Sequence, residues 1–449
     1  MTKRILLVNP PFYRLQGSHF NGMSLGLAYI GAVLEQHGHE VRILNADYEP
    51  NDRYATMREL FLGHWGYKET LNNLSHYLWQ EIKKQIRQYA PDYIGVTMHT
   101  GTFKSAQNVA RVAKSLDSNV QLVAGGPHAT LMPAEVINSG FDYLIQGEGE
   151  YPFLALADGY RPRDIPGLAF ISKSRVVNNP AAPQIQNLDV LPFPIRDPTK
   201  YLNDSSYADF GFIVTGRGCA FRCSFCASPS LWGGRVRFRS ARNVVAEIQH
   251  VTETSDVKLI RFADDTFTQN REHTRGICNL MLSESVTPDW VCDTRADAIT
   301  SELVELMRKA GCVRIRIGAE SGSDRILRSV HKGVTTEQIR NAAKIVKDAG
   351  IDLTLYLMIG FPSETHAEMR QTLDFAREID PTYCSLSILA PYPGSRIYAN
   401  IMNDGGKLPS DHWEYFYHQS REMMLCDNVD GRLIEECMKL NDINGKRRM

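Results

Sequence analysis

The sequence has 449 residues, with 50 Lys plus Arg against 51 Asp plus Glu, so its formal net charge is −1. This balance argues against a broad nucleic-acid-binding surface, which needs clustered positive charge. The apolar runs fall short of the ~20 residues that a membrane-spanning helix needs. The first apolar run, residues 5–8, is too short for a signal peptide. We therefore expect a cytoplasmic protein with no membrane span and no nucleic-acid partner.

Residues 4–150 alternate short apolar runs with stretches of helical periodicity. Strands are expected at 4–9, 41–44, 93–97, 120–124 and 143–145, and helices at 25–36, 71–89 and 102–115. Strands that alternate with helices predict an α/β fold with a parallel, doubly wound sheet. Ligands of such sheets bind beyond the carboxyl ends of the strands. Candidate binding residues therefore follow the third to fifth strands: Thr97, Gly125, Gly126, Pro127 and Gly147.

The alternation stops and then resumes further along the chain. Residues 160–205 contain seven prolines and predict a linker with a small hairpin around 168–177. Six strands are then expected, at 212–215, 259–263, 290–293, 313–317, 353–359 and 383–389, and helices among them at 241–251, 301–310, 336–349 and 364–378. Six β/α units predict a partial barrel with its chemistry at the carboxyl ends of the strands. The expected boundaries are a first domain at 1–155, a linker at 156–205, the barrel at 206–405 and an extension at 406–449, with a short helix at 432–440.

Three of the nine cysteines crowd into one loop after the first barrel strand, namely Cys219, Cys223 and Cys226. The first 218 residues contain no cysteine, which suits a reducing compartment better than a disulfide framework. Thiolates are the usual ligands of iron–sulfur clusters. Three of them would bind three irons of a four-iron cluster and leave the fourth iron open. A closed zinc site wants four ligands, and the next cysteine is distant; zinc and a chance group of thiols remain the alternatives.

The Cys-x-x-x-Cys-x-x-Cys spacing after the first strand of a β/α barrel resembles the radical S-adenosylmethionine (SAM) superfamily. The resemblance implies a [4Fe-4S] cluster held by these cysteines, with SAM bound to the open iron through its amino and carboxylate groups. It also implies reductive cleavage of SAM to a 5′-deoxyadenosyl radical. An electron donor such as flavodoxin or ferredoxin is then a required partner.

The resemblance assigns SAM contacts to residues that follow the later barrel strands. Asp264 and Asp265 would hold the methionine amino group, and Arg295 would pair with the methionine carboxylate. Glu320 and Ser321 would contact the ribose and methionine. The alternatives are a helix N-cap for the aspartates and a surface salt bridge for Arg295. No residue is assigned a catalytic role.

The first domain resembles the Rossmann-like cobalamin-binding domain found ahead of such barrels. The matching motifs are Asn9-Pro10-Pro11, Leu25-Gly26-Leu27, residues 97–101 and Gly125-Gly126-Pro127-His128. The resemblance implies that the nucleotide tail of cobalamin runs along Thr97, Gly125, Gly126, Pro127 and Gly147. Residues 10–23 lack the Asp-x-His-x-x-Gly pattern that supplies a lower cobalt ligand in many such domains. We therefore expect no histidine on cobalt, neither His19 nor His99 nor His128.

Together the two resemblances favour methyl transfer to an unactivated carbon, or to phosphorus, of a small-molecule substrate. The first alternative is a cobalamin-binding radical SAM enzyme that forms a ring or rearranges a skeleton, as in the anaerobic cyclase of bacteriochlorophyll synthesis. The second is a non-enzymatic cobalamin sensor. Methylthio transfer is rejected, because it needs a second cluster held by N-terminal cysteines.

Overall fold

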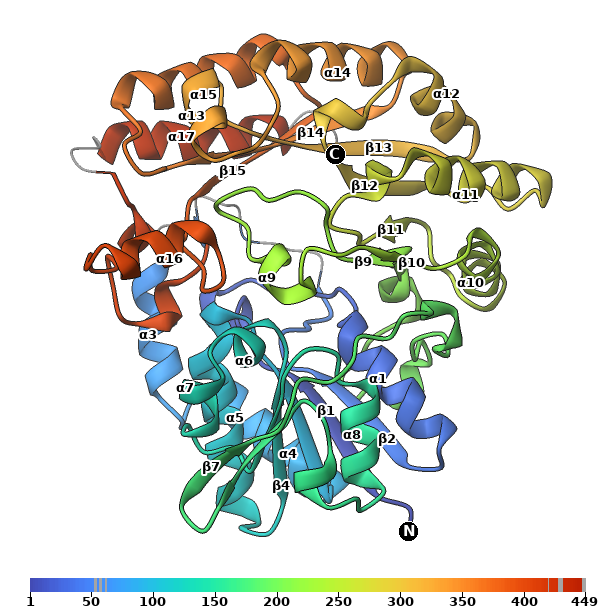
Figure 1. Ribbon diagram of the computed structural model, residues 1–449, viewed down its shortest axis with the longest axis vertical. Coiled ribbons are helices and arrows are strands. Elements are labelled where there is room, and N and C mark those ends of the chain that lie inside the picture. Colours follow the sequence, from blue (N-terminus) through green and yellow to red (C-terminus); the bar gives the residue numbers. More distant parts are fainter. Residues whose placement is uncertain (52–54, 56–58, 61–62, 419, 427–430, 446–449) are drawn as a thin grey trace. The chain divides into compact units, whose positions relative to one another are not determined.

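The structure is a computed structural model that describes residues 1–51, 55, 59–60, 63–418, 420–426 and 431–445. The chain forms two compact units. The first contains the described residues of 1–54, 63–210 and 412–414, and the second contains the remaining described residues. Each unit is built around its own sheet (Figure 1).

The sheet of the first unit has the order β2-β1-β3-β4-β5-β6-β7. Its first five strands pair in parallel, as the doubly wound pattern predicts. They are β1 (Arg4–Asn9), β2 (Glu40–Asn45), β3 (Tyr93–Thr97), β4 (Gln121–Gly125) and β5 (Tyr143–Ile145). The hairpin expected near residue 170 is present as β6 (Leu168–Ser172) and β7 (Arg175–Asn178), and it extends this sheet in antiparallel fashion.

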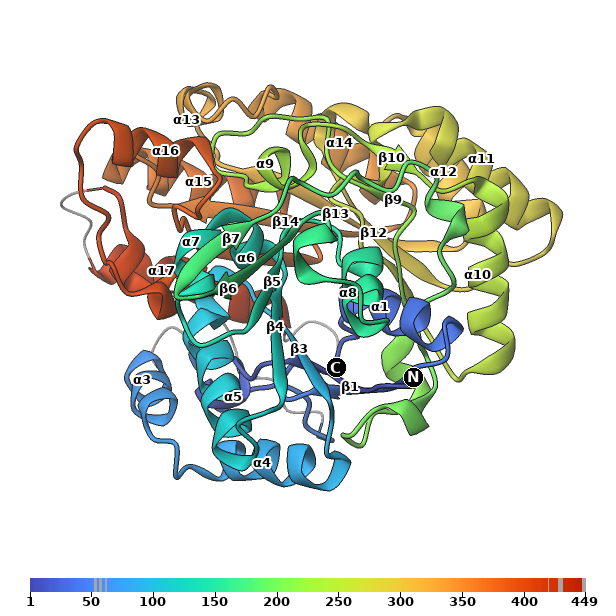
Figure 2. The same cartoon turned by 60° about the horizontal axis from the view of Figure 1, so that its bottom comes forward.

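Helices cover both faces of this sheet. On one face α1 (Leu25–Gln36) packs against α8 (Glu150–Ala157), and on the other α4 (Tyr77–Tyr89) packs against α5 (Phe103–Leu116) (Figures 1 and 2). Shorter helices are α3 (His64–Asn72), α6 (Pro127–Leu131) and α7 (Pro133–Ile137). The single helix expected over 71–89 is wrong. The side chain of Asn73 accepts a hydrogen bond from the backbone N–H of Ser75 (3.0 Å), a local bond that competes with helix continuation.

The second unit contains a six-stranded parallel sheet of order β15-β14-β13-β12-β11-β8. The strands are β8 (Phe212–Ile213), β11 (Ile260–Phe262), β12 (Trp290–Thr294), β13 (Cys312–Glu320), β14 (Asp352–Ile359) and β15 (Tyr383–Ile388). All six lie where the sequence predicts them, and their spatial order follows the chain. The six-unit partial barrel is therefore confirmed. A small antiparallel hairpin, β9 (Gly216–Arg217) with β10 (Arg237–Phe238), follows the first strand.

An outer layer of helices follows the strands of the second unit in chain order (Figure 1). It comprises α10 (Ala241–Thr254), α11 (Arg271–Ser283), α12 (Ser301–Lys309), α14 (Thr336–Asp348) and α15 (His366–Ile379). Each helix is preceded by a capping residue whose side chain accepts a hydrogen bond from a backbone N–H of the first turn. In chain order these residues are Ser240, Asn270, Thr300, Thr335 and Thr365. Further helices are α9 (Ser228–Trp232), α13 (Asp324–Ser329), α16 (Arg396–Asn403) and α17 (Gly431–Gly445), the last along β15.

Packing between the sheet and its helices fixes the carboxyl edge of the second unit. Phe262 at the end of β11 stacks on Phe267 with ring centroids 4.5 Å apart, and Trp290 meets Phe262 edge-on. All three rings are fully buried. Phe262 and Phe267 stand at the two ends of the segment that leaves β11, so their stacking holds this loop at the carboxyl edge of the sheet. None of the described helices combines the length and the apolar character that a bilayer-spanning segment requires.

Candidate functional site

The cysteine loop begins at the β9–β10 hairpin. Gly218 has φ = +102°, and a Cβ there would approach the carbonyl oxygen of Arg235 to 2.2 Å. Only glycine fits, because both the conformation and the close backbone approach exclude a side chain. The hairpin thus turns the chain into the loop that carries Cys219, Cys223 and Cys226, each half-buried.

Each of the three thiols has a hydrogen-bonding neighbour. The backbone N–H of Ser228 donates to Cys226 Sγ (3.4 Å), Arg295 Nη1 donates to Cys223 Sγ (3.7 Å), and Thr266 Oγ1 lies 3.8 Å from Cys219 Sγ. Burial raises the pKa of Cys223, and it raises the pKa of Cys226 to about 12. Burial thus favours the neutral form of these two thiols, and the positive charge of a bound metal would oppose this effect. The donors aimed at the half-buried sulfurs of Cys223 and Cys226 fit an iron–sulfur cluster, whose sulfurs accept such bonds.

Arg295 is a buried cation that contacts this loop. It follows β12 and is 4 % exposed, and the salt bridge that the alternative expects is present with Asp297 but lies largely buried. Its guanidinium donates to both carboxylate oxygens of Asp297 (3.0 and 2.9 Å) and to the carbonyl of Lys332 (2.5 Å). It also lies over the ring of Phe221, 3.7 Å from the centroid. Arg295 thus ties the cysteine loop to the loops that follow β12 and α13.

Glu320 and Lys332 form a buried ion pair beside Arg295. Lys332 Nζ donates to Glu320 Oε1 at 2.6 Å, and both residues are under 9 % exposed. Glu320 has φ = +66°, at an irregularity where β13 pairs with β14. A Cβ on Gly318 would stand 2.7 Å from Glu320 Oε1 and 2.9 Å from Lys332 Nζ. Glycine at 318 therefore leaves room for the ion pair above the strand.

The two aspartates after β11 bind opposite ends of the cysteine loop. Asp264 Oδ1 accepts from the backbone N–H (3.1 Å) and the hydroxyl (2.8 Å) of Thr215. Burial raises the pKa of Asp264 to about 6, against the opposing effect of these hydrogen bonds. Asp265 is exposed and accepts from the hydroxyl of Ser228 (2.5 Å). The helix-cap alternative does not describe Asp264, since Asn270 caps α11.

Ser321 lies apart from these contacts. It is fully buried, its hydroxyl lies 3.2 Å from that of Thr372 on α15, and it accepts from the backbone N–H of Ser323 (3.1 Å). The structure thus brings Cys223, Arg295, Lys332 and Glu320 into one chain of contacts. Lys332 and Thr215 were missed from the sequence, where no motif marks them. The strand-end position of Thr215, just before the cysteine motif, was the one available signal.

The candidate residues of the first unit meet at the carboxyl ends of β3, β4 and β5. Thr97 pairs in register with Gly125, and a Cβ on Gly126 (φ = +94°) would lie 2.7 Å from Thr97 Oγ1. The N–H of Gly147 donates to Thr130 Oγ1 (3.0 Å), and Thr130 Oγ1 in turn donates to the carbonyl of Gly126 (3.0 Å). A Cβ on Gly125 or Gly147 would meet no atom within 4 Å. This bare backbone beside open space fits a bulky ligand such as the tail of cobalamin.

The histidines of the first unit differ in exposure. His128 is fully buried, its Nδ1 lies 3.2 Å from Thr100 Oγ1, and its ring packs between Phe103 and Trp413. Burial lowers the pKa of His128 to about 4, so its ring is neutral near pH 7. His19 is buried, whereas His99 is exposed.

The class of protein follows from comparison with known families. The profile of the radical SAM superfamily matches residues 213–376, and that of the B12-binding domain matches residues 18–157. The chain belongs to the radical SAM superfamily, in the group that carries a B12-binding domain, and it is an enzyme of this class.

Two relatives are similar to the chain in sequence, and one solved structure is similar to it in fold. A protein of Pyrococcus horikoshii described as an uncharacterized methyltransferase is 33% identical, over 88% of this chain and 82% of the relative. The anaerobic magnesium-protoporphyrin IX monomethyl ester cyclase of Rubrivivax gelatinosus is 28% identical, over 82% of this chain and 67% of the relative. The radical SAM methyltransferase TsrM of Kitasatospora setae, solved with cobalamin and a [4Fe-4S] cluster, shares the fold with a TM-score of 0.70 at 19% identity, over 90% of this chain and 78% of that one.

Proposed function

We propose that this protein is a cobalamin-dependent radical SAM methyltransferase that acts on an unactivated carbon of a small molecule. One observation carries the proposal: the same chain contains two candidate cofactor sites. They are the three-cysteine loop and the glycine-lined edge of the first sheet. Similarity to a described methyltransferase along most of both chains supports it.

In this proposal Cys219, Cys223 and Cys226 hold a [4Fe-4S] cluster. Such a cluster supplies the electron that cleaves SAM into methionine and a 5′-deoxyadenosyl radical. Glu320 Oε1 accepts a hydrogen bond from Lys332, which leaves the other carboxylate oxygen for a ligand. The side chain of Asp265 is exposed. These two carboxylates are the proposed partners of the SAM amino group. Asp264 accepts hydrogen bonds from Thr215, and Arg295 donates to Asp297, Lys332 and Cys223. These two residues are proposed to hold the loop in place.

Cobalamin is proposed to bind the first unit, where its chemistry would be to carry a methyl group from SAM to the substrate. The residues proposed to contact it are Thr97, Gly125, Gly126, Pro127 and Gly147. Gly126 keeps the turn after β4 close to Thr97, and Gly125 and Gly147 leave the strand ends bare. The protein's share of the work is therefore to leave room and to orient the ligand.

The test is product analysis with SAM that carries a deuterated methyl group. The reconstituted protein, reduced anaerobically, is incubated with a metabolite extract of cells that carry the gene. We expect a product that has gained a deuterated methyl group, formed together with 5′-deoxyadenosine. The variant with all three loop cysteines changed to Ala should form neither. A new product without deuterium would contradict methyl transfer.

The second candidate is ring formation or rearrangement with the same two cofactors. The similarity to an anaerobic cyclase over 82% of this chain favours it specifically. It predicts 5′-deoxyadenosine together with a product that has gained no methyl group. That product has lost hydrogen if a ring forms, and it is an isomer of the substrate if the skeleton rearranges. The cobalamin-sensor hypothesis is set aside, because the chain belongs to a family of enzymes.

A further inference from the structure

One stretch of this nearly neutral chain carries charge of a single sign. Residues 210–246 contain no Asp, Glu or Lys, and they contain six arginines. The stretch begins before the cysteine loop and ends in the second turn of α10. Its arginines are Arg217, Arg222, Arg235, Arg237, Arg239 and Arg242.

The β9–β10 hairpin gathers these arginines around the cysteine loop. It pairs Arg217 with Arg237 and brings the carbonyl of Arg235 beside Gly218, next to Cys219. The guanidinium of Arg222 lies 3.6 Å from the Cβ position of Gly234, so Arg222 and Arg235 belong to the same patch.

The arginines of the hairpin divide into inner and outer ones. Arg239 is buried and forms an ion pair with Glu247, so it serves the fold. Arg222 and Arg235 are exposed, and within the described part of the chain neither side chain makes an ion pair or a hydrogen bond. Their charge is therefore available to a partner.

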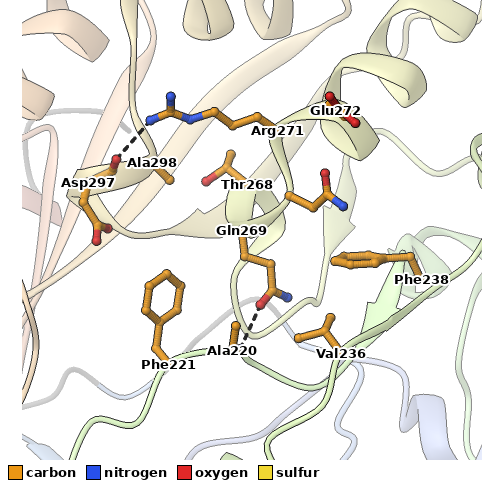
Figure 3. A pocket seen from close by; sticks show the side chains of 11 residues that line it. Ala220, Phe221, Val236, Phe238, Thr268, Gln269, Arg271, Glu272, Asp297 and Ala298 are labelled. Atoms are coloured by element: carbon orange, nitrogen blue, oxygen red, sulfur yellow. Dashed lines mark hydrogen bonds between the residues drawn. The ribbon is translucent and has the colours of Figure 1, made fainter.

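A cavity of about 550 Å³ lies against the same loop (Figure 3). The rings of Phe221 and Phe238 form parts of its wall, and Gln269 lies between them. Gln269 accepts from the N–H of Ala220 (3.1 Å) and donates to the carbonyl of Gly218 (3.0 Å). Ala220 and Phe221, which line the cavity, are flanked in the chain by Cys219 and Cys223. The cavity is therefore a hollow that reaches the cysteine loop itself.

We propose that Arg222 and Arg235 form the docking surface for an acidic electron-carrier protein, whose redox group approaches the cavity beside Phe221. The inference rests on the proposed function, which requires one electron for each SAM cleaved. The donor loses that electron and the cluster gains it, so the step is balanced. Exposed positive charge steers a negatively charged partner to this face and sets its orientation. A hollow that reaches the loop shortens the path to the cluster.

The test compares a protein donor with a small chemical one. In the full-length reconstituted protein, the rate of cluster reduction by reduced flavodoxin is measured for wild type and for the Arg222→Glu/Arg235→Glu double variant. We expect at least a tenfold lower second-order rate constant for the double variant at low ionic strength. The Arg222→Gln/Arg235→Gln variant should fall between. Reduction by titanium(III) citrate should be unchanged in both.

A matched control comes from the opposite end of the sheet. Lys258 is exposed and precedes β11, so Lys258→Glu reverses one positive charge at the amino ends of the strands, where the double variant reverses two beside the cysteine loop. It should leave both rates unchanged, and the effect of the double variant should fade as salt rises. Equal losses with both reductants, or an unchanged rate with flavodoxin, would overturn the proposal. The proposal would also be overturned if the only effect of the double variant were a higher KM for an anionic substrate. Because cluster reduction is measured directly, a failure of methyl transfer would leave this test intact.

Discussion

At the scale of single residues, Cys223 is a half-buried thiol with three charged side chains around it. The positive charges of Lys332 and Arg295 favour its ionised form, whereas Glu320 and burial oppose ionisation. A metal cluster bound there would meet the same three side chains. The residues around Cys223 should therefore affect the cluster in directions set by the sign of their charge.

The simplest residue-scale prediction concerns the thiols as ligands. Replacing Cys219, Cys223 and Cys226 together by Ala should remove the iron and the visible absorbance of anaerobically reconstituted protein, because no ligand set remains. Iron analysis by mass spectrometry measures the loss. Cys278→Ala is the control, since Cys278 is fully buried in the core on α11 and should keep the wild-type iron content. A triple variant with full iron would refute the assignment.

The ion pair of Glu320 and Lys332 beside Cys223 predicts that removing either charge shifts the midpoint potential of the cluster, in opposite directions. Lys332→Met removes a cation that stabilises the reduced, more negative cluster, so its midpoint potential should fall. Glu320→Gln removes the opposing anion and keeps Lys332, so the potential should rise. A redox titration followed by paramagnetic resonance measures both shifts. Lys344→Met, which breaks an exposed pair on α14, should change nothing. Shifts in the same direction would indicate a purely structural role.

The sequence predicts those site residues whose type alone indicates their chemistry. It does not predict the residues whose role depends on the direction in which the side chain points. Three cysteines in one loop point to a cluster wherever the loop lies. Asp264 occupies the expected strand end, yet its oxygens accept from Thr215, and Ser321 is buried against α15. Which way a strand-end side chain points depends on contacts from other strands. Lys332 follows a short helix without any motif, and only the fold brings it to Glu320.

At the scale of elements, the turn between β14 and α15 holds a buried carboxylate that titrates near neutral pH. Glu364 Oε2 accepts from the backbone N–H groups of Gly360 (2.7 Å) and Phe361 (3.1 Å). Burial raises the pKa of Glu364 from its usual 4.5 to about 7. The folded state therefore binds more protons than the unfolded state between these values, and this group's contribution to stability is lost as pH rises through 7.

Glu364→Gln tests this linkage, because Gln keeps an acceptor oxygen and does not titrate. The melting temperature of wild type relative to Glu364→Gln should fall as pH is raised from about 4.5 to about 8, as the wild-type carboxyl loses its proton. Calorimetry at several pH values measures the difference. Glu378→Gln is the contrast, since the Arg340 guanidinium lowers the pKa of that exposed carboxyl; its effect should be small and of opposite sign. A pH-independent difference for Glu364→Gln would contradict the shift.

The regular elements were predictable because their periodicity is local. The strands at 4–9 and 93–97 and the helix at 25–36 match the structure to the residue. α11 lies between two expected strands, where the six β/α units imply a helix without giving its bounds, and its buried positions Thr274, Ile277, Cys278 and Met281 have helical spacing. β13 runs three residues beyond its expected end, through Gly318, Ala319 and Glu320. These residues lack a strand signal and continue only because β14 pairs with them across an irregularity.

At the scale of the whole molecule, each of the two units contains one of the two candidate cofactor sites. The first 218 residues contain no cysteine, and the glycine-lined edge belongs to the first sheet alone. Cobalamin binding should therefore depend on the first unit and iron binding on the second. The expected domain boundaries at 155 and 205 stay predictions. They concern which segments fold independently, whereas the two compact units are defined by contacts between residues.

The last prediction concerns cobalt in the full-length protein. We expect the first unit to bind cobalamin with its lower base detached and no histidine on cobalt. The turn of residues 10–23 lacks the histidine pattern, and His128, the histidine nearest the glycines, is held in the core between Phe103 and Trp413. To reach cobalt, His128 would have to leave that packing and its contact with Thr100, which costs free energy. A cobalt without a strong lower donor should also release a methyl group more readily to a carbon radical.

Paramagnetic resonance of the cob(II)alamin form, in protein carrying ¹⁵N-labelled histidine, provides the measurement. An imidazole below cobalt splits the signal, and the label changes the number of lines, which distinguishes protein histidine from the cofactor's own base. We expect no splitting that responds to the label. Label-sensitive splitting that vanishes in His19→Ala or His128→Gln would identify a ligand and refute the expectation. A protein that takes up no cobalamin would refute the methyl-transfer proposal as well, because the first unit would then hold no methyl carrier.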